Sequence, residues 1–273
     1  MTTIGFIGGG NMAVSLIGGL INAGVPASDI TVAEPDEARQ IALQQQFNIT
    51  TSGDNNSLLN CDTVVLAVKP QLLKTVCRQL DKSNLSNSLF ISIAAGVNSN
   101  DINRWLNNDQ AIVRCMPNTP ALLQSGVSGL FANDLVNGAQ KKQAEKILQA
   151  VGIVVWVDDE QQLNAVTAVS GSGPAYFFLM MEAMQQAGEK LGLSTDVAKT
   201  LVIQTALGAA RMASESKSSP AELRQQVTSK GGTTEQAILS FQTENFQDIV
   251  LHALEAANER SISLAEELGS EPT

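Results

Sequence analysis

The first strand and turn constrain what this chain can fold into more than any other stretch. An apolar run over residues 3–7 breaks into three consecutive glycines, and apolar residues then recur at helical spacing over residues 12–21. This order predicts a strand, a tight turn and a helix. Within it, Gly8, Gly10 and Ala13 match the G-x-G-x-x-G/A spacing of turns that bind dinucleotides.

Small residues at these positions have distinct physical roles. Gly8 permits the tight turn, Gly10 lets the backbone approach a pyrophosphate, and Ala13 lets the helix pack close to the strand. The free N–H groups and the positive dipole end of the helix favour phosphates. Glycine-rich turns also occur without a ligand, but this one follows a strand and opens a helix. The turn therefore predicts a dinucleotide cofactor.

The second predicted strand, Ile30 to Glu34, bears on the choice of cofactor. Glu34 lies about 20 residues beyond the glycine turn, where an acidic side chain can bond the adenosine ribose 2′-OH. This favours NAD over NADP. Two alternatives stay open: Glu34 is only a solvent-exposed strand end, or Arg39 accepts a 2′-phosphate and NADP binds.

Further apolar runs of strand length predict a sheet. Three of them end in small or polar residues, and ligands of open parallel sheets bind at such carboxyl ends. The last two flank a predicted helix over residues 136–150. The alternation of strands and helices over residues 1–157 predicts a doubly wound α/β domain. The five runs are 62–68, 88–93, 111–116, 127–132 and 152–157.

From about residue 158 the pattern becomes helical throughout. We therefore expect two domains, a dinucleotide-binding Rossmann-type domain over residues 1–158 and an all-helical domain over residues 159–273. The fold class is α/β, with an all-α C-terminal domain. The expected helices cover residues 160–170, 174–190, 195–217, 220–227, 233–242 and 245–268.

One helix of the second domain indicates subunit contact. Residues 176–181 are apolar on nearly all sides, so we expect this helix to be buried all round. Such burial in a small helical domain predicts an obligate dimer through this domain.

The single histidine, His252, lies far from every motif and is expected at a helix surface or an interface.

The second domain also holds two unusual loops. Residues 228–235 present two adjacent glycines, several hydroxyls and the N–H groups of a new helix. This geometry suits a carboxylate or phosphate, although a turn capped by Thr233 or Thr234 explains the same residues. Residues 168–176 are small enough for a ligand or another chain to approach, or they only break a helix. Thr167 either faces the cleft or bonds its own backbone.

Composition disfavours several classes of function. The 273 residues carry a net charge of −10, and no basic stripe is available to neutralise the phosphates of a nucleic acid. Three scattered cysteines and one histidine offer neither a disulfide framework nor a metal ligand set. With no visible signal peptide and no apolar run of about 18 residues, we expect a cytoplasmic protein without a membrane span.

Six motifs, in this order, resemble those of the pyrroline-5-carboxylate reductase family, and the resemblance covers about residues 3–268. The last two motifs are far more specific than the glycine turn. The six are Gly-Gly-Gly-Asn-Met-Ala at 8–13, Ala-Val-Lys-Pro at 67–70, Ser-Ile-Ala-Ala-Gly at 92–96, Arg-Cys-Met-Pro-Asn-Thr-Pro at 114–120, Ser-Gly-Ser-Gly-Pro-Ala-Tyr at 170–176 and Val-Thr-Ser-Lys-Gly-Gly-Thr-Thr at 227–234.

This resemblance implies an activity and an assembly. The reaction would be the reduction of 1-pyrroline-5-carboxylate to L-proline, the last step of proline biosynthesis, with reduced NADP or NAD as the hydride donor. An N-terminal Rossmann domain would bind the cofactor. The C-terminal helical domain would bind substrate and intertwine with a partner copy into a homodimer, and such dimers often assemble into decamers.

The resemblance also implies a site, residue by residue. Thr167 would lie near the ring nitrogen of the substrate as the catalytic residue, and Asn118 would lie near the nicotinamide. No metal is expected. The substrate would contact Glu160, Thr167, Ser229, Gly232, Thr233 and Thr234. The cofactor would contact Phe6, Ile7, Gly8, Gly9, Gly10, Asn11, Met12, Glu34, Asn55, Ala67, Val68, Lys69, Pro70, Ala94, Ala95, Gly96 and Asn118.

The chain departs from the family pattern at three places. Lys230 stands where many members have proline, which adds a positive charge beside the carboxylate site. Glu34 stands where many have a short hydroxyl or a basic residue, which puts the choice of NADP in doubt. The cofactor-contacting asparagine is Asn55, or a gap in the alignment leaves Asp54 at that position.

The implied reaction requires the protein to position the substrate against the cofactor more than to supply acid–base groups. A protonated cyclic imine is already a strong hydride acceptor, so no side chain is expected to be an indispensable general acid.

Two other classes of protein are disfavoured. β-Hydroxyacid dehydrogenases share the two-domain plan but place a catalytic lysine on the helix after the Gly-Ser-Gly turn, where the first lysine here is Lys190. A non-catalytic NAD(P) sensor has no need for the loop at 228–234.

Overall fold

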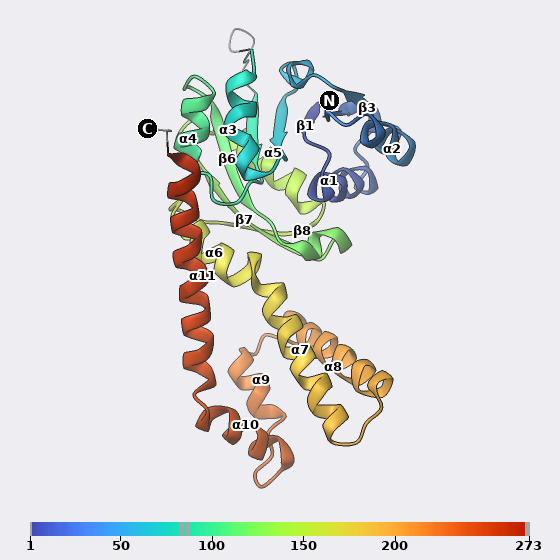
Figure 1. Ribbon diagram of the computed structural model, residues 1–273, viewed down its shortest axis with the longest axis vertical. Helices are drawn as coiled ribbons and strands as arrows, with labels where there is room; N and C mark the ends of the chain where they lie inside the picture. The colour runs from blue at the N-terminus through green and yellow to red at the C-terminus, as the bar shows by residue number, and fades with distance from the viewer. Residues whose placement is uncertain (1, 82–84, 86–87, 271–273) are drawn as a thin grey trace. The chain divides into compact units, whose positions relative to one another are not determined.

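The apolar runs of the N-terminal half pair into one eight-stranded sheet in the computed structural model, which describes residues 2–81, 85 and 88–270. The strand order is β3-β2-β1-β4-β5-β6-β7-β8, and all neighbours are parallel except β6 and β7. This confirms the predicted doubly wound α/β architecture (Figure 1). The strands are β1 (Ile4–Ile7), β2 (Ile30–Ala33), β3 (Thr50–Ser52), β4 (Thr63–Leu66), β5 (Leu89–Ser92), β6 (Ala111–Met116), β7 (Gly126–Ala132) and β8 (Gly152–Trp156).

The chain divides into two compact units, residues 1–172 with 256–273 and residues 173–255.

Strand β3 was not predicted from the sequence, because its three side chains are polar. The helices are α1 (Asn11–Asn22), α2 (Glu37–Phe47), α3 (Pro70–Gln79), α4 (Ser99–Trp105), α5 (Gly138–Gln149), α6 (Gln162–Val166), α7 (Gly173–Lys190), α8 (Thr195–Glu215), α9 (Pro220–Gln226), α10 (Thr233–Thr243) and α11 (Phe246–Gly269).

Successive side chains of the strands point into two cores, one on each face of the sheet. Phe6 and Val65 belong to the core that α1, α2 and α5 cover. Ile7 and Val64 belong to the core that α3 and α4 cover. Because helices cover both faces, β1, β4 and β5 are buried along their whole length.

The strand order reverses between β1 and β4, which lie side by side although β2 and β3 separate them in the chain. Open α/β sheets bind ligands at the carboxyl ends of the strands beside such a switch point. There the Ala67 N–H donates to Ile7 O (2.9 Å). The turns that follow β1 and β4, residues 8–10 and 67–70, are therefore neighbours at this edge of the sheet.

The first unit extends beyond the domain expected over residues 1–158, because two helical segments pack with the sheet. Helix α6 lies on β7, where a Cβ added at Gly129 would come within 2.5 Å of Val166 Cγ1. The last part of α11 lies on the loop after β5, where a Cβ added at Gly96 would come within 3.1 Å of Leu264. The domain boundary between residues 158 and 159 stays a prediction.

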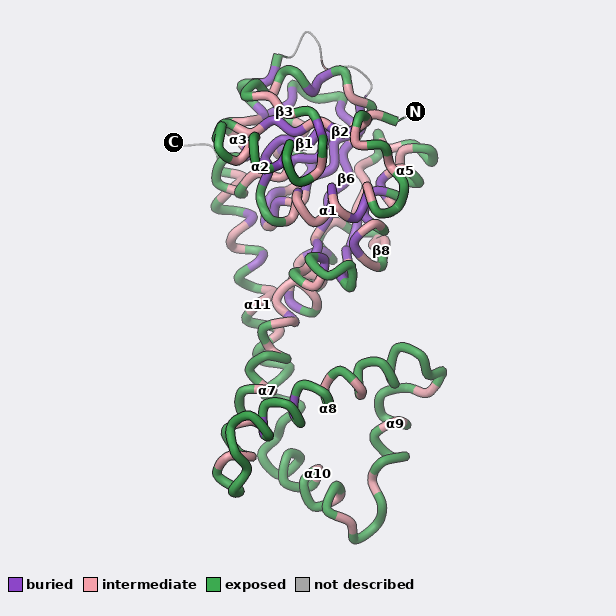
Figure 2. The backbone as a smooth tube through the Cα atoms, turned by 90° about the vertical axis from the view of Figure 1, so that its right-hand side faces the viewer, coloured by how far each residue is buried: buried purple, intermediate pink, exposed green. Residues whose placement is uncertain are grey.

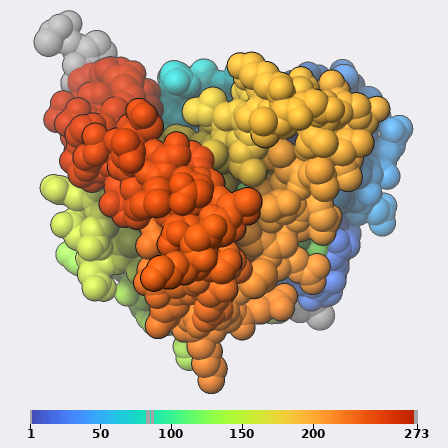
Figure 3. Space-filling view, turned by 90° about the horizontal axis from the view of Figure 1, so that it is seen from below, coloured from blue at the N-terminus to red at the C-terminus, as the bar shows by residue number. Residues whose placement is uncertain are grey.

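The second unit consists of α7 to α10 and the first part of α11. Of its residues, all of which the structure describes, only Gly173, Ala198 and Val202 are buried. Figure 2 shows this as a nearly continuous exposed backbone, and Figure 3 shows the surface atoms of these helices in yellow to red. A helical unit with so few buried side chains lacks a hydrophobic core of its own.

The expectation that residues 176–181 are buried all round is wrong for the single chain. Phe177, Phe178 and Leu179 are 68%, 64% and 66% exposed. Their pattern is that of a buried helix, yet the second unit supplies no layer of side chains to cover them. Exposed apolar patches of this kind mark interaction surfaces.

Among the residues that the structure describes, no helix is long and apolar enough to cross a membrane. In the same residues, no group of three or more His, Cys, Asp or Glu side chains is arranged to hold a metal ion. No disulfide joins the three cysteines, all of which are described, and burial raises the pKa of the Cys115 thiol to about 12.

Candidate active site

The glycine turn after β1 is shaped to receive a phosphate group. Gly8 has a φ of +97°, and a Cβ added there would lie 2.9 Å from Ala67 O. Gly10 is the N-cap of α1, and a Cβ there would meet only Ala67 O, at 4.0 Å. No described side chain caps α1. The start of this helix is therefore open, and its N–H groups fit the pyrophosphate of a dinucleotide.

Glu34 and Arg39 both hold the peptide groups of Gly9. Glu34 Oε2 accepts a hydrogen bond from the Gly9 N–H (2.9 Å), and Glu34 Oε1 accepts one from the Asp36 N–H (3.2 Å). Arg39 Nε donates to Gly9 O (2.6 Å). The two side chains that bear on cofactor choice thus lie together beside the turn, where a dinucleotide places its adenosine ribose.

Two further loops lie at the same edge, because residues 67–70 and 94–96 follow the neighbouring strands β4 and β5. Lys69 is exposed as the N-cap of α3. Gly96 has a φ of +70°, and its lack of a side chain makes room for Leu264 of α11. Helix packing thus explains the glycine at this position, and contact of the loop with a cofactor stays a prediction.

Asn55 begins a short 3-10 helix, Asn55–Leu58, after β3. Asp54 caps this turn, because its side chain accepts from the Asn56 N–H (2.9 Å) and from Asn56 Nδ2 (3.0 Å). The Asp54 carboxylate is therefore engaged within its own turn. Asn55, which is half-buried, remains the candidate for cofactor contact from this loop.

Asn118 follows β6, and its amide group bonds to the protein on both sides. Oδ1 accepts from the Val127 N–H (3.0 Å), and Nδ2 donates to Ser170 O (3.2 Å). The carboxyl end of β6 is at the same edge as the glycine turn, because β1, β4, β5 and β6 run parallel. The predicted contact of Asn118 with the nicotinamide is not tested by these bonds.

Thr167 is the first residue of a π-helical turn, Thr167–Gly171, that follows α6. Its hydroxyl donates to Leu163 O (2.7 Å), which is the backbone bond that the sequence left open. The hydroxyl proton is therefore committed, whereas the Thr167 oxygen keeps lone pairs that can accept a hydrogen bond. Thr167 is half-buried, so part of its surface is accessible to a small ligand.

Glu160 bonds to protein groups through both carboxylate oxygens. Oε1 accepts from the Ser99 N–H (2.6 Å) and from Arg114 Nη1 (2.8 Å), and Oε2 accepts from the Ser99 hydroxyl (2.8 Å). These bonds join the start of α4, strand β6 and the loop before α6. Glu160 therefore has a structural role, and its predicted contact with substrate stays a prediction.

Arg114, which was not among the predicted site residues, is 7% exposed on β6. A charged side chain inside a buried strand needs charged or hydrogen-bonding partners. Arg114 Nη1 contacts Glu160 Oε1 and Asn98 Oδ1 (3.0 Å). The lone arginine within the apolar run at 111–116 was the signal from which this network could have been predicted.

The loop at 228–235 leads into α10, whose N-cap is Gly232. The alternative that Thr233 or Thr234 caps this helix is therefore wrong, because both residues lie inside its first turn. No side chain of the described residues caps α10, and both threonines are exposed.

The loop is folded by its own hydrogen bonds. Gly231, with a φ of +74°, donates its N–H to Glu235 Oε2 (2.7 Å), and the Gly232 N–H donates to Ser229 O (3.0 Å). The Ser229 hydroxyl and the first N–H groups of α10 then lie at an uncapped helix start. Such a helix start attracts anions, including carboxylates.

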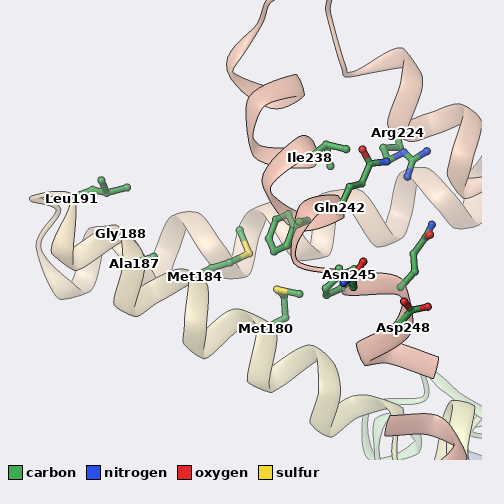
Figure 4. Close-up of a pocket in the computed structure, with 13 residues that line it drawn as sticks. Met180, Met184, Ala187, Gly188, Leu191, Arg224, Ile238, Gln242, Asn245 and Asp248 are labelled. Carbon is green, nitrogen blue, oxygen red and sulfur yellow. The ribbon is translucent and has the colours of Figure 1, made fainter. Parts of the chain in front are cut away.

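A cavity of about 640 Å³ lies within the second unit, between α7, α9, α10 and α11 (Figure 4). Met180, Met184 and Ile238 line its apolar wall. None of the predicted site residues lines it, so this cavity is not the candidate active site.

Two family models match the chain. The model "Pyrroline-5-carboxylate reductase dimerisation" matches residues 160–264, and the model "NADP oxidoreductase coenzyme F420-dependent" matches residues 3–96. The pyrroline-5-carboxylate reductase of Pseudomonas aeruginosa is 54% identical over 97% of this chain and 98% of its own length. That of Vibrio alginolyticus is 45% identical over 94% of this chain and 96% of its own length.

Solved structures show the same likeness. A pyrroline-5-carboxylate reductase from Coxiella burnetii has a TM-score of 0.93 at 46% identity, covering 97% of this chain and 98% of the other. The pyrroline carboxylate reductase of Plasmodium falciparum with NADP bound has a TM-score of 0.84 at 32% identity, with the same coverage. The match extends over nearly the whole length of this chain.

Proposed function

This chain belongs to the pyrroline-5-carboxylate reductase family, and on that premise we propose that it reduces 1-pyrroline-5-carboxylate to L-proline. The structural observation that carries the proposal is the open start of α1 beside the β1–β4 switch point, which fits a dinucleotide. When bound, a reduced nicotinamide supplies a hydride, which adds to the carbon of the protonated C=N bond while the electron pair of that bond returns to nitrogen.

NADH is the proposed donor in preference to NADPH. Both oxygens of Glu34 are held by the backbone N–H groups of Gly9 and Asp36, so the carboxylate is already oriented beside the turn. A carboxylate at this place accepts from ribose hydroxyls and repels a 2′-phosphate. Arg39 at Gly9 O is the group that would admit NADPH instead.

The substrate carboxylate is proposed to bind at the start of α10, through Ser229, Gly232, Thr233 and Thr234. Support comes from the uncapped helix end and its exposed threonines. Lys230 adds a positive charge at the same loop, which favours an anionic ligand.

Thr167 is proposed to accept a hydrogen bond from the protonated ring nitrogen of the substrate. The Thr167 hydroxyl already donates a hydrogen bond to Leu163 O, so toward a ligand its oxygen can only accept. An N–H donor is present on the iminium form, which is the form that accepts a hydride. The chain of bonds from the ring N–H to Thr167 and on to Leu163 O then orients the reactive form of the imine without a general acid.

The dimerisation model over residues 160–264 indicates a homo-oligomer. We propose a dimer formed through the C-terminal domain, assembly of such dimers into a decamer, and a cytoplasmic location. The apolar faces that α7 and α8 leave exposed support an interface through these helices.

The activity is tested by following the absorbance of NADH or NADPH after adding 1-pyrroline-5-carboxylate to the purified protein. Loss of reduced cofactor with formation of proline is the expected outcome, and it is faster with NADH. A protein that binds cofactor with no turnover of the imine would instead be a sensor. Oxidation of a β-hydroxyacid with NAD would indicate the related dehydrogenase class.

A further inference from the structure

The π-helical turn at Thr167–Gly171 interrupts the regular helical hydrogen bonds at one point of the fold. The Ser172 N–H bonds to Thr167 O (2.8 Å), five residues back. Single π turns of this kind are rare and often mark functional sites, because the widened turn moves side chains and carbonyl groups away from their α-helical positions. Something outside the helix must therefore stabilise this turn.

Asn118 bonds to this turn from the end of β6. Its Nδ2 donates to Ser170 O (3.2 Å), inside the π turn, and its Oδ1 accepts from the Val127 N–H (3.0 Å) at the start of β7. With both ends of the amide bonded to backbone, its plane and direction are determined. Asn118 thus ties the π turn to the β6–β7 pair.

A second contact, from the last residue of β6, supports the turn. A Cβ added at Gly171 would collide with Met116 Cε, so the glycine lets the last residue of β6 pack directly under the turn. The strand end therefore touches the π turn at two places, one polar and one apolar. Both places lie at the edge of the sheet that carries the glycine turn.

We propose that Asn118 is a positioning residue, which holds the π turn and through it sets the place of the Thr167 hydroxyl, instead of contacting the nicotinamide. The proposal rests on the role given to Thr167 in the proposed function. Its physical basis is that both ends of the Asn118 amide bond to backbone groups within the first unit.

A matched control stands at the opposite end of the same two strands. Asn133 also bridges two backbone groups, because its Oδ1 accepts from the Ile112 N–H (3.0 Å) and its Nδ2 donates to Gln110 O (2.9 Å). Asn118→Ala and Asn133→Ala each remove two such bonds. The two variants are therefore expected to lower thermal stability to a similar extent, and only N118A is expected to change turnover.

The test combines steady-state kinetics with a fluorescence titration of NADH. For N118A we expect kcat to fall by about tenfold, the loss of one well-placed hydrogen bond, while the Kd for NADH stays within about twofold. N133A is expected to keep both values. A Kd for NADH raised tenfold with kcat unchanged at saturating cofactor would show that Asn118 contacts the cofactor, and would overturn the proposal.

A double-mutant cycle with Thr167→Val tests whether Asn118 acts through Thr167. We expect N118A to cost little in the T167V background, because the positioned group is already gone. Equal losses in both backgrounds would overturn the proposal.

If T167V alone is fully active, the role of Thr167 in the proposed function fails by itself. Hydrogen exchange of the amides at 168–172 then still tests whether Asn118 holds the π turn. Exchange that is faster in N118A than in N133A would support its hold on the turn, and equal exchange would refute it.

Discussion

At the scale of single residues, bonds within the protein decide what a polar side chain is free to do. The family resemblance implies that Thr167 and Glu160 contact the substrate. In the structure the Thr167 hydroxyl donates a hydrogen bond to Leu163 O, and the Glu160 carboxylate accepts hydrogen bonds from Ser99 and Arg114. A hydroxyl with a committed proton acts as an acceptor, and an ion-paired carboxylate acts as a structural tie. These bonds limit what the two side chains can offer a ligand, and their contacts with substrate stay predictions.

Replacing Thr167 by valine removes the proposed acceptor for the ring N–H. A hydrogen bond to a charged group is worth about 1.5–3 kcal/mol, so we expect kcat to fall by roughly 10–100-fold. Thr200→Val is the matched control, because the Thr200 hydroxyl makes the same kind of bond, to Asp196 O (2.8 Å), on exposed α8. Steady-state kinetics measure both variants, and a fully active T167V would remove Thr167 from the mechanism.

Replacing Glu34 by serine is expected to change cofactor preference. The substitution removes a negative charge that disfavours a 2′-phosphate and leaves Arg39 beside the turn. We expect the ratio of kcat/KM for NADH to that for NADPH to fall by about tenfold, which corresponds to about 1.4 kcal/mol. Glu37→Ser, on the exposed first turn of α2, serves as control. An unchanged ratio in E34S would place the discrimination elsewhere.

At the scale of elements, two helix starts carry the proposed binding of anions. Gly10 is the N-cap of α1 and Gly232 is the N-cap of α10, and no described side chain caps either helix. An uncapped start leaves backbone N–H groups for a ligand and directs the positive end of the helix dipole at it. The start of α1 comes shortly after a buried strand, and the start of α10 follows a glycine pair in a loop between helices. Different local sequences therefore produce the same kind of anion-binding helix start.

Replacing Thr234 by valine tests the start of α10. A carboxylate clamp binds ground state and transition state similarly, so we expect the KM for substrate to rise by roughly tenfold with kcat nearly unchanged. Thr243→Val on the same helix is the control, because the Thr243 hydroxyl only bonds its own backbone at Leu239 O (2.9 Å). A drop in kcat at constant KM would contradict a clamp role.

At the scale of the whole molecule, the second unit leaves an apolar surface uncovered, which the proposed dimer would bury. Phe177, Phe178 and Leu179 stand exposed on α7, and full burial of such side chains is worth about 1.5–3 kcal/mol each. A unit that buries three residues cannot offset the entropy of ordering its chain. We therefore expect the partner copy of the proposed dimer to contribute to folding as well as to assembly.

Light scattering at low micromolar concentration is expected to give at least a dimer. Replacing Phe178 and Leu179 by aspartate places two charges in the proposed interface, and we expect dissociation with loss of helical signal in circular dichroism. Ile41→Asp, at an exposed position on α2 of the first unit, should leave the molar mass measured by light scattering unchanged. A monodisperse monomer of the unaltered protein would contradict an obligate dimer.

Local signals were sufficient for much of the fold. Apolar runs such as 62–68 predicted buried parallel strands, and the spacing of Gly8, Gly10 and Ala13 predicted the turn that the structure shows, with φ at Gly8 of +97°. The polar β3 carried no such signal, because its neighbour β2 supplies the pairing. Cap identity at Gly232 was also hidden, since several residues in the loop are equally good caps.

The sequence by itself determined most of the order of strands and helices, the polar β3 excepted, together with the glycine turn and the family, because these depend on periodicity and on residue types at short spacing. Only the tertiary structure decided that Glu160 pairs with Arg114, that Asn118 bonds Ser170 O, and that the apolar face of α7 is left uncovered. Those facts depend on which distant segments meet, and a hydrogen bond or a buried surface exists only when both sides are in place.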